Sequence, residues 1–186
     1  MNLYEKYQQG LKYHDFLARH GTSMHQGNWQ KVHEQIALTP AQKALLQSFT
    51  RSMPVLCLAG AWCGDCVNQC PIFAHFEAAT PTIQMRYIDR DVHADAQAAL
   101  QICGGNRVPV LVFFSEDGFE AARCGDRTIS KYRAMMRDQA GPSCPTGITV
   151  GKDPLLVQVT QDWLQEFERV QWMLRLSQRL RNLHND

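Results

Sequence analysis

Residues 61–66 read Ala-Trp-Cys-Gly-Asp-Cys, shortly after the apolar run Val-Leu-Cys-Leu-Ala at 55–59. The run predicts a buried strand and the residues after it have helical character, so the cysteines stand where a strand passes into a helix. The C-x-x-C spacing lets the two sulfurs meet within one turn as a disulfide. Cys63 falls at the predicted helix N-terminus, where free N–H groups and the helix dipole favour a thiolate. We therefore predict a lowered pKa for Cys63 as the attacking thiol, with Cys66, less exposed, resolving the mixed disulfide.

Several features downstream of this motif follow it in a characteristic order. They are Pro71, the dipeptide Val108-Pro109, the apolar run 110–114, the turn Glu116-Asp117-Gly118 and Gly125. A C-x-x-C alone is a weak signal, but combined with the preceding tryptophan and these prolines it is strong. Over about residues 50–138 the chain resembles the thioredoxin family, with Asp65 where the family motif W-C-G-P-C has proline. The form W-C-x-D-C is similar to that of bacterial thioredoxin-like proteins.

The resemblance implies an α/β, three-layer, thioredoxin-like fold with a central mixed four-stranded sheet, N-terminal helices and a long C-terminal helix. It implies a thiol-disulfide oxidoreductase that acts on protein disulfides through the two motif cysteines, with no cofactor and no metal. Trp62 and Gly64 would shape the exposed rim of the site. A cis peptide bond would precede Pro109, as in other tight functional turns, and leave the Val108 backbone free to pair with an extended substrate.

Two departures from the family pattern concern the chemistry of the site. Thioredoxins bury an aspartate six residues before the first motif cysteine as a proton acceptor for the resolving thiol, whereas this chain has Cys57 there. A thiol is a poor base, so proton transfer needs water or another group, and Asp65 is one candidate. The family's strand lysine also has no counterpart at 83–89. These departures bear on the rate and the reduction potential rather than on the fold.

Asp65 also suggests a direction for the reaction. A carboxylate close to both sulfurs disfavours a thiolate, because a like charge raises the pKa of a thiol. A less stable thiolate makes the dithiol a better reductant, so we expect a protein-disulfide reductase rather than an oxidase. The sequence leaves open a second interpretation, in which Asp65 only complements the dipole at the helix N-terminus.

Composition limits the classes of protein that the chain can represent. Its 186 residues fit one domain with a sizeable core. The net charge of +1 gives no reason to expect a nucleic-acid or membrane partner. No apolar run approaches the ~18 residues of a membrane span, and the first residues lack the apolar segment of a signal peptide. The seven cysteines are an odd number, which fits reduced thiols in the cytoplasm better than a full disulfide framework.

We expect one domain, 1–186, with an N-terminal helical extension (1–50), a core (51–140) and a C-terminal helix (153–186). Apolar spacing and capping residues in the extension predict a helix over 2–18 and another from Thr39-Pro40 to about Phe49. The stretch at 21–37 between them is polar, and we expect its histidines to be solvated or locally packed rather than to bind a metal.

The core is predicted to alternate strands and helices around one sheet. The predicted strands are 55–59, 83–87, 110–114 and 119–124. The predicted helices follow Cys66 as far as Thr80, extend over about 92–102 with Asp91 as the cap, and begin at Thr128 or Ser130 and end before Gly141. A Gly/Pro loop containing Cys144 is predicted at 141–151.

The predicted C-terminal helix, roughly residues 154–183, carries two apolar stripes. The first comprises Leu156, Val159, Trp163, Phe167, Val170 and Leu174, and the second comprises Met173, Leu176, Leu180 and Leu183. We favour packing of this face on the core, because surface helices commonly bury such a face. The alternative is that the helix forms a homodimer or binds another partner.

Two other functions compete with disulfide exchange. Cys63, Cys66 and Cys70, followed by proline, resemble the end of an iron–sulfur run, C-x2-C-x3-C-P, and could hold a metal, although a fourth ligand is missing locally. Cys70 and Cys57 are more simply buried core thiols. A non-catalytic adaptor would keep the fold and bind a partner through its terminal helices. The substrate protein and the electron donor stay open. So do the roles of Cys103, Cys124 and Cys144, for which free thiols are the default.

Overall fold

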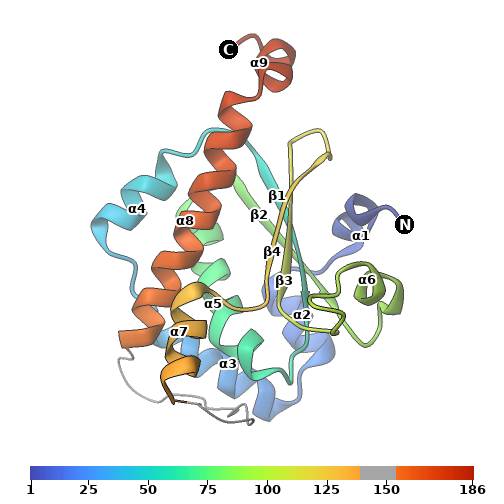
Figure 1. Ribbon diagram of the computed structural model, residues 1–186, viewed down its shortest axis with the longest axis vertical. Coiled ribbons are helices and arrows are strands. Elements are labelled where there is room, and N and C mark those ends of the chain that lie inside the picture. The colour runs from blue at the N-terminus through green and yellow to red at the C-terminus, as the bar shows by residue number, and fades with distance from the viewer. Residues whose placement is uncertain (139–153) are drawn as a thin grey trace.

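The computed structural model describes residues 1–138 and 154–186, and its elements surround one sheet (Figure 1). In chain order they are α1 (Leu3–Gln9), α2 (Tyr13–His20), α3 (Ser23–Gln35), α4 (Pro40–Gln47), β1 (Met53–Ala59), α5 (Gly64–Ala79), β2 (Ile83–Asp89), α6 (Ala94–Ala99), β3 (Val110–Phe114), β4 (Glu120–Gly125), α7 (Ile129–Asp138), α8 (Pro154–Leu176) and α9 (Gln178–His184). The predicted loop at 141–151, with its Cys144, lies outside the described residues.

The four strands form one mixed sheet in the order β2-β1-β3-β4. β1 pairs in parallel with β2 and antiparallel with β3, and β3 pairs antiparallel with β4. Every residue of β1 is buried, since the strand has a neighbour on each side and helices over both faces. The predicted α/β fold with a central mixed four-stranded sheet is therefore confirmed.

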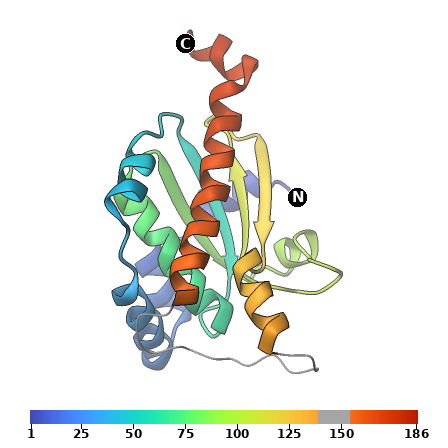
Figure 2. The same ribbon diagram turned by 60° about the vertical axis from the view of Figure 1, so that its left-hand side comes forward.

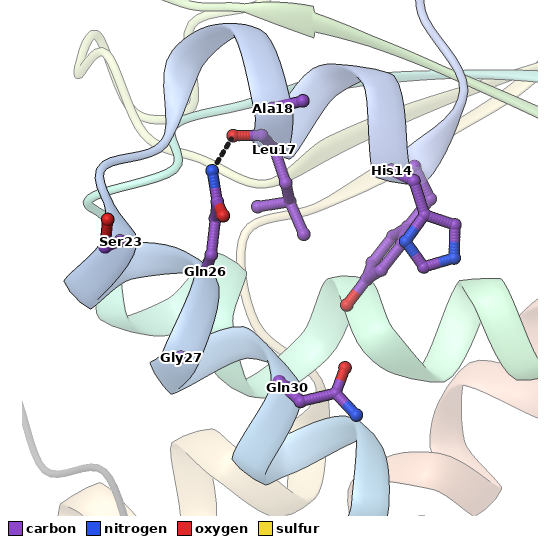
Figure 3. Close-up of a pocket in the computed structure, with 8 residues that line it drawn as sticks. His14, Leu17, Ala18, Ser23, Gln26, Gly27 and Gln30 are labelled. Atoms are coloured by element: carbon purple, nitrogen blue, oxygen red, sulfur yellow. Dashed lines mark hydrogen bonds between the residues drawn. The ribbon is translucent and has the colours of Figure 1, made fainter.

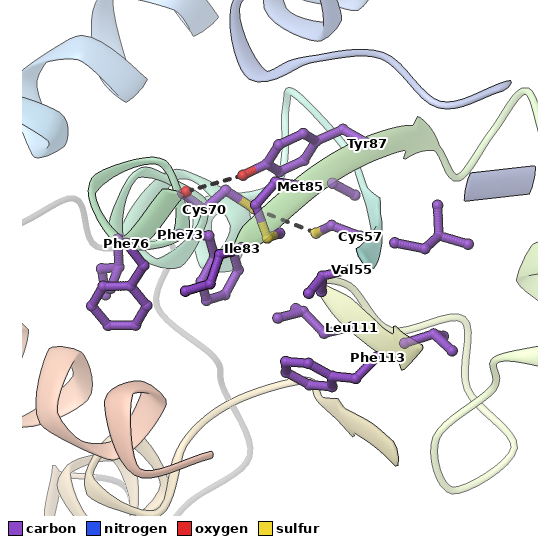
Figure 4. Close-up of a cluster of buried hydrophobic side chains, with 14 of the residues drawn as sticks. Val55, Cys57, Cys70, Phe73, Phe76, Ile83, Met85, Tyr87, Leu111 and Phe113 are labelled. Atoms are coloured by element: carbon purple, nitrogen blue, oxygen red, sulfur yellow. Dashed lines mark hydrogen bonds between the residues drawn. The ribbon is translucent and has the colours of Figure 1, made fainter. Parts of the chain in front are cut away.

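Helices cover the two faces of the sheet and make three layers. α5 and α8 lie on one side and α1 and α6 on the other (Figure 1), and α8 runs across α5 and β4 (Figure 2). On the α5 side, Cys57, Leu111 and Phe113 of the central strands point towards the helix (Figure 4). On the α1 side, the ring of Phe114 lies 5.3 Å from that of Tyr4. The buried side chains on the two faces of the sheet therefore belong to one hydrophobic core.

The N-terminal segment forms two helices rather than the single helix predicted over 2–18. Leu11, between α1 and α2, pairs with the edge strand β2. Its N–H donates to the carbonyl of Tyr87 at 2.9 Å, and the Tyr87 N–H donates back to the Leu11 carbonyl at 2.8 Å. Gly10 allows this close approach, because a Cβ at that position would lie 2.8 Å from the Cβ of Arg86.

The polar stretch at 21–37 contains a helix, α3, for which the sequence analysis predicted no element. Thr22 caps it by accepting a hydrogen bond from the His25 N–H at 3.3 Å. Trp29 and Val32 are its buried residues, so its apolar stripe is too narrow to stand out in the sequence. By contrast, α4 begins at Pro40 with Thr39 as its cap, as predicted.

The helix predicted over 92–102 is shorter than expected and has a different start. α6 has His93 as its N-cap, so the predicted cap at Asp91 is wrong. The turn before α6 is made by Asp89, whose carboxylate accepts hydrogen bonds from the N–H groups of Asp91 and Val92 at 2.9 and 3.2 Å.

The C-terminal segment packs on the core with the first of its two apolar stripes. From Val159 to Leu174 the residues of that stripe are buried, whereas Met173, Leu176 and Leu183 of the second stripe are exposed. The single predicted helix is two, α8 and α9, because the Ser177 hydroxyl caps a new helix by accepting from the Leu180 N–H at 3.4 Å. Packing on the core, the favoured interpretation, is confirmed for the first stripe and for Leu180 of the second. A homodimer through the C-terminal helix stays a prediction.

Phe167 should be a main anchor of α8. Its ring has no exposed surface and lies 5.3 Å from Phe76 and 5.0 Å from Phe113. Replacing Phe167 by alanine should lower the free energy of unfolding by about 3–5 kcal/mol, as measured by urea denaturation, because a cavity replaces these contacts. Leu176→Ala, on the same helix but 77% exposed, is the matched control and should change it by less than ~0.5 kcal/mol. Equal losses in the two variants would contradict this packing.

Candidate active site

The C-x-x-C motif lies between the end of β1 and the start of α5, as predicted. Cys63 is the N-cap of α5, with an extended backbone at φ −78° and ψ 124°, and Gly64 is the first helical residue. The Cys63 N–H donates to the Gly60 carbonyl at 3.0 Å, and the Cys63 carbonyl accepts from the Val67 N–H at 2.9 Å. The chain therefore turns from strand to helix within the motif.

The loop before β3 brings Val108 and Pro109 against the first motif cysteine. The Val108-Pro109 peptide bond is cis, as predicted. The Cys63 thiol has two possible acceptors for its one proton: the Val108 carbonyl, with 3.6 Å between sulfur and oxygen, and the Cys66 sulfur. Cys63 is half-buried and Cys66 has no exposed surface, and both are free thiols. Cys63 is therefore the motif sulfur that a disulfide in solution can reach.

The two motif thiols share a hydrogen bond, and this decides which of them ionises more readily. Burial opposes ionisation of Cys66, but hydrogen bonds from the Cys63 and Cys70 thiols and the Gly60 N–H outweigh it and lower the pKa of Cys66 to about 5. The hydrogen bond to Cys66, reinforced by burial, raises the pKa of Cys63. The predicted lowering of the Cys63 pKa is thus wrong for the free dithiol. The hydrogen bond that the Cys63 thiol donates to the Cys66 sulfur favours the thiolate at Cys66 and the protonated thiol at Cys63.

Trp62 lies at the exposed rim of the motif. Its side chain is 47% exposed, its indole N–H donates to the Asp91 carboxylate at 3.1 Å, and the Arg90 guanidinium lies 4.5 Å from its ring centre. A Cβ at Gly60 would lie 2.9 Å from this ring. The tryptophan is thereby held over the turn, in a position suited to the predicted contact with a substrate.

Asp65 forms an ion pair that the sequence analysis did not anticipate. Its carboxylate lies 2.6 Å from the guanidinium of Arg127, in the turn after β4, and both side chains are largely buried. The charge of Asp65 raises the pKa of both Cys63 and Cys66, as expected, although it is a minor contribution beside their hydrogen bonds. Since 62 positions separate the pair and no motif contains Arg127, the sequence carried no signal for it.

A buried carboxylate, Asp126, joins the segments around the site. Arg107, beside Val108, lies 3.2 Å from it, Arg127 lies 3.4 Å from it, and the Tyr132 hydroxyl on α7 donates to it. Burial raises the pKa of Asp126, but the Tyr132 hydrogen bond and the two arginines outweigh this and lower it. The preceding Gly125 has a φ of +159°, and a Cβ there would lie 2.7 Å from the Pro109 carbonyl.

Comparison with known proteins places this arrangement in a family. A family model described as thioredoxin matches residues 10–140. The chain belongs to the thioredoxin family. No curated protein matches the sequence.

Two solved structures resemble this thioredoxin-family protein in fold. A Pseudomonas aeruginosa protein of unknown function has 15% identity and a TM-score of 0.71, and the match covers 91% of this chain and 96% of that one. An HIV epitope-scaffold has 18% identity and a TM-score of 0.61, with 94% and 95% covered. At these identities the likeness shows a shared fold over most of the chain and carries no activity across.

Two buried side chains outside the motif form hydrogen bonds with the backbone around this thioredoxin site. Nothing in the sequence assigned either of them to it. The indole N–H of Trp29, on α3, donates to the Ala61 carbonyl at 2.8 Å. Gln69, on α5, donates to the Asp126 carbonyl at 2.9 Å and accepts from the Trp163 indole at 2.8 Å. All three contacts join residues far apart in the sequence, so spacing alone could not have found them.

The structure bears on the competing functions within the part of the chain that it describes. Among residues 1–138 and 154–186, no three His, Cys, Asp or Glu side chains are placed to hold a metal ion. No helix in those ranges is both long and apolar enough to cross a membrane.

A separate hollow of about 420 Å³ lies between α2 and α3 (Figure 3). None of its lining residues belongs to the motif.

The free energy of unfolding should depend on pH through Asp126. Its pKa in the folded protein lies below the ordinary 3.8, so its contribution is present above about pH 4 and is lost as pH falls through the lower folded value. Asp126→Asn should therefore lower the free energy of unfolding by about 1–3 kcal/mol at pH 7, where a charged hydrogen-bond acceptor is lost. The deficit should shrink at acid pH, as followed by urea denaturation across the pH range.

The control for this measurement is Asp15→Asn, at an exposed aspartate on α2, which should stay within ~0.5 kcal/mol of the unmodified protein. A deficit for Asp126→Asn that stays constant down to the lowest pH would contradict the role of its charge.

Proposed function

We propose that this protein is a thiol-disulfide oxidoreductase that reduces disulfides in protein substrates. The observation that carries the proposal is the pair of motif thiols at the start of α5. Cys66 is buried, and Cys63 is half-buried and faces the Val108 carbonyl. Membership of the thioredoxin family supports it. The reaction needs no cofactor, because both electrons come from the two thiols.

The first step is attack on the substrate disulfide by the Cys63 sulfur. A Cys63–substrate bond forms, the substrate S–S bond breaks, and one substrate sulfur leaves as a thiolate. The proton of Cys63 passes along its hydrogen bond to Cys66, whose lowered pKa allows it to be the anion beforehand. The shared hydrogen bond thus activates the exposed thiol, although that thiol has the higher pKa of the two.

The second step resolves the mixed disulfide. Cys66 gives its proton, through water, to the substrate thiolate released in the first step. Its sulfur then attacks the sulfur of Cys63, which forms the Cys63–Cys66 disulfide and releases the second substrate sulfur. The two departing thiolates are protonated, so the substrate gains two electrons and two protons. A dithiol partner, whose identity the sequence leaves open, would restore the reduced state by the reverse exchange. This requirement favours a cytoplasmic location, where thiols are kept reduced.

Substitution of the two cysteines separates this proposal from a non-catalytic adaptor. Cys63→Ser should abolish disulfide reduction, measured with insulin as substrate, because the attacking sulfur is gone. Cys66→Ser should leave the first step intact and accumulate a mixed disulfide on Cys63, detectable by mass spectrometry. Cys103→Ser, at an exposed cysteine outside the motif, is the matched control and should keep full activity. Unchanged reduction in Cys63→Ser would overturn the proposal.

The direction of the reaction should depend on the Asp65–Arg127 ion pair. Asp65→Asn removes a charge that disfavours the thiolate, so the reduced form is stabilised and the reduction potential becomes less negative. Arg127→Gln leaves that charge unpaired and should shift the potential the opposite way. Each shift should be on the order of 10–30 mV against a glutathione buffer, since about 30 mV corresponds to a tenfold change in the equilibrium. If neither variant moves the potential, Asp65 acts only on the helix dipole.

A further inference from the structure

A line of four cysteine sulfurs, which we call the thiol array, runs from the surface into the core. It comprises Cys63, Cys66, Cys70 and Cys57. Cys70 lies one turn after Cys66 on α5, where its thiol contributes to lowering the pKa of Cys66. The sulfur of Cys57 on β1 lies 3.9 Å from that of Cys70 (Figure 4). Cys57, Cys66 and Cys70 have no exposed surface. The exchange proposed above uses the outer two thiols, which leaves the inner two without a role.

The resolving step changes the set of hydrogen bonds available to the Cys66 sulfur. In the free dithiol, Cys66 accepts from the Cys63 thiol, the Cys70 thiol and the Gly60 N–H, the last at 3.5 Å. In the mixed disulfide Cys63 is bonded to substrate and has no proton to donate. Cys66 must nevertheless become an anion at a site without exposed surface, where an anion lacking donors is strongly disfavoured. Within the described residues, the donors left to it are the Gly60 N–H and the Cys70 thiol.

The other titratable groups around these sulfurs cannot take over this task. Asp65 carries a negative charge that disfavours the Cys66 thiolate, and it is paired with Arg127. Beside Cys70 lie the phenols of Tyr13 and Tyr87, and burial raises the pKa of both. The Tyr87 hydroxyl donates to the Cys70 backbone carbonyl at 3.4 Å rather than to a sulfur.

Cys57 is placed to orient the thiol of Cys70. Cys70 has one S–H and two sulfur neighbours, so it can donate to Cys57 or to Cys66, but not fully to both. The Cys57 thiol has its own alternatives, the Leu58 carbonyl at 3.9 Å and the Cys70 sulfur at 3.9 Å. When Cys57 donates to Cys70, the Cys70 hydrogen is directed towards Cys66. Burial raises the pKa of both inner thiols, which keeps their protons available for donation.

We propose that Cys70 is a third catalytic cysteine, which donates a hydrogen bond to the Cys66 sulfur while Cys66 resolves the mixed disulfide, and that Cys57 is a positioning residue that acts through Cys70. The inference rests on the proposed disulfide exchange and deepens it. No electron passes to the inner thiols, and neither forms a bond to sulfur. Their contribution is a hydrogen bond that strengthens as negative charge collects on Cys66.

The test uses the small disulfide 5,5′-dithiobis(2-nitrobenzoate) and a chain in which Cys103, Cys124 and Cys144 are replaced by serine. Attack by Cys63 releases one coloured thiolate, and resolution by Cys66 releases a second, so each step is read separately. Cys70→Ala should shift the midpoint of the pH profile of the second release upwards by about one pH unit, because a hydrogen bond to a charged sulfur is lost. Below the midpoint, the second release should be about threefold slower, since greater nucleophilicity offsets half of the tenfold loss of thiolate.

Conservative variants separate a hydrogen bond from packing. Cys70→Ser keeps a donor and should keep the pH midpoint close to that of the unsubstituted Cys70 chain. Cys70→Val fills the site without a donor, and it should behave like Cys70→Ala even if the alanine variant folds poorly. Cys57→Ala should shift the midpoint in the same direction by a smaller amount. Added to Cys70→Ala it should have no further effect, because a residue that acts through Cys70 has nothing left to orient.

Specific results would overturn the inference. An unchanged midpoint in Cys70→Val, or a shift in Cys70→Ser as large as that in Cys70→Val, would remove Cys70 from the reaction. An additive effect of Cys57→Ala on the Cys70→Ala background would remove the positioning role of Cys57. Failure of the proposed function is distinguishable, because it would abolish the first release from Cys63, whereas the Cys70 and Cys57 variants all keep the attacking sulfur of Cys63.

Discussion

Burial of β1 on both faces and both edges is the constraint on which the rest of the structure depends. Each of its residues is buried, and it pairs with β2 on one side and β3 on the other. Its end at Ala59 is therefore fixed by two ladders, and the turn that follows presents the Gly60 N–H and Cys63 at defined positions. The reactive cysteine gains its placement from the strand before it as much as from the helix that it caps.

Around this fixed turn, the site is completed by segments that come together through buried polar contacts. The Asp126 carboxylate forms an ion pair with Arg107, in the loop before β3, and accepts a hydrogen bond from Tyr132 on α7. Its backbone carbonyl accepts a hydrogen bond from Gln69 on α5. A buried carboxylate is tolerated there because charged and polar donors surround it. The same contacts set the distance between the Val108 carbonyl and the motif, so the substrate-facing loop and the thiols form one unit.

The sequence predicted the features that depend on local patterns. Apolar runs located β1 and β3, alternating apolar residues located β2, and the hairpin turn at 116–118 located β4. The spacing of Cys63 and Cys66 located the start of α5. Features that depend on contacts across the fold were either not predicted or predicted wrongly. Nothing local showed that Leu11 would pair with β2 and divide the first helix. The pKa of Cys63 was predicted from the helix dipole alone, whereas the hydrogen bond to the buried Cys66 sulfur dominates and reverses its direction.

The interruption between α1 and α2 has a consequence for self-association. β2 is an outer strand of the sheet, and outer strands offer unpaired backbone groups to which another chain can add. Here those groups are already engaged: Leu11 pairs with both backbone groups of Tyr87, and the Glu77 carboxylate accepts from the Met85 N–H at 2.9 Å. The short segment that breaks the helix thus covers part of this border of the sheet, where the backbone of another chain could otherwise pair.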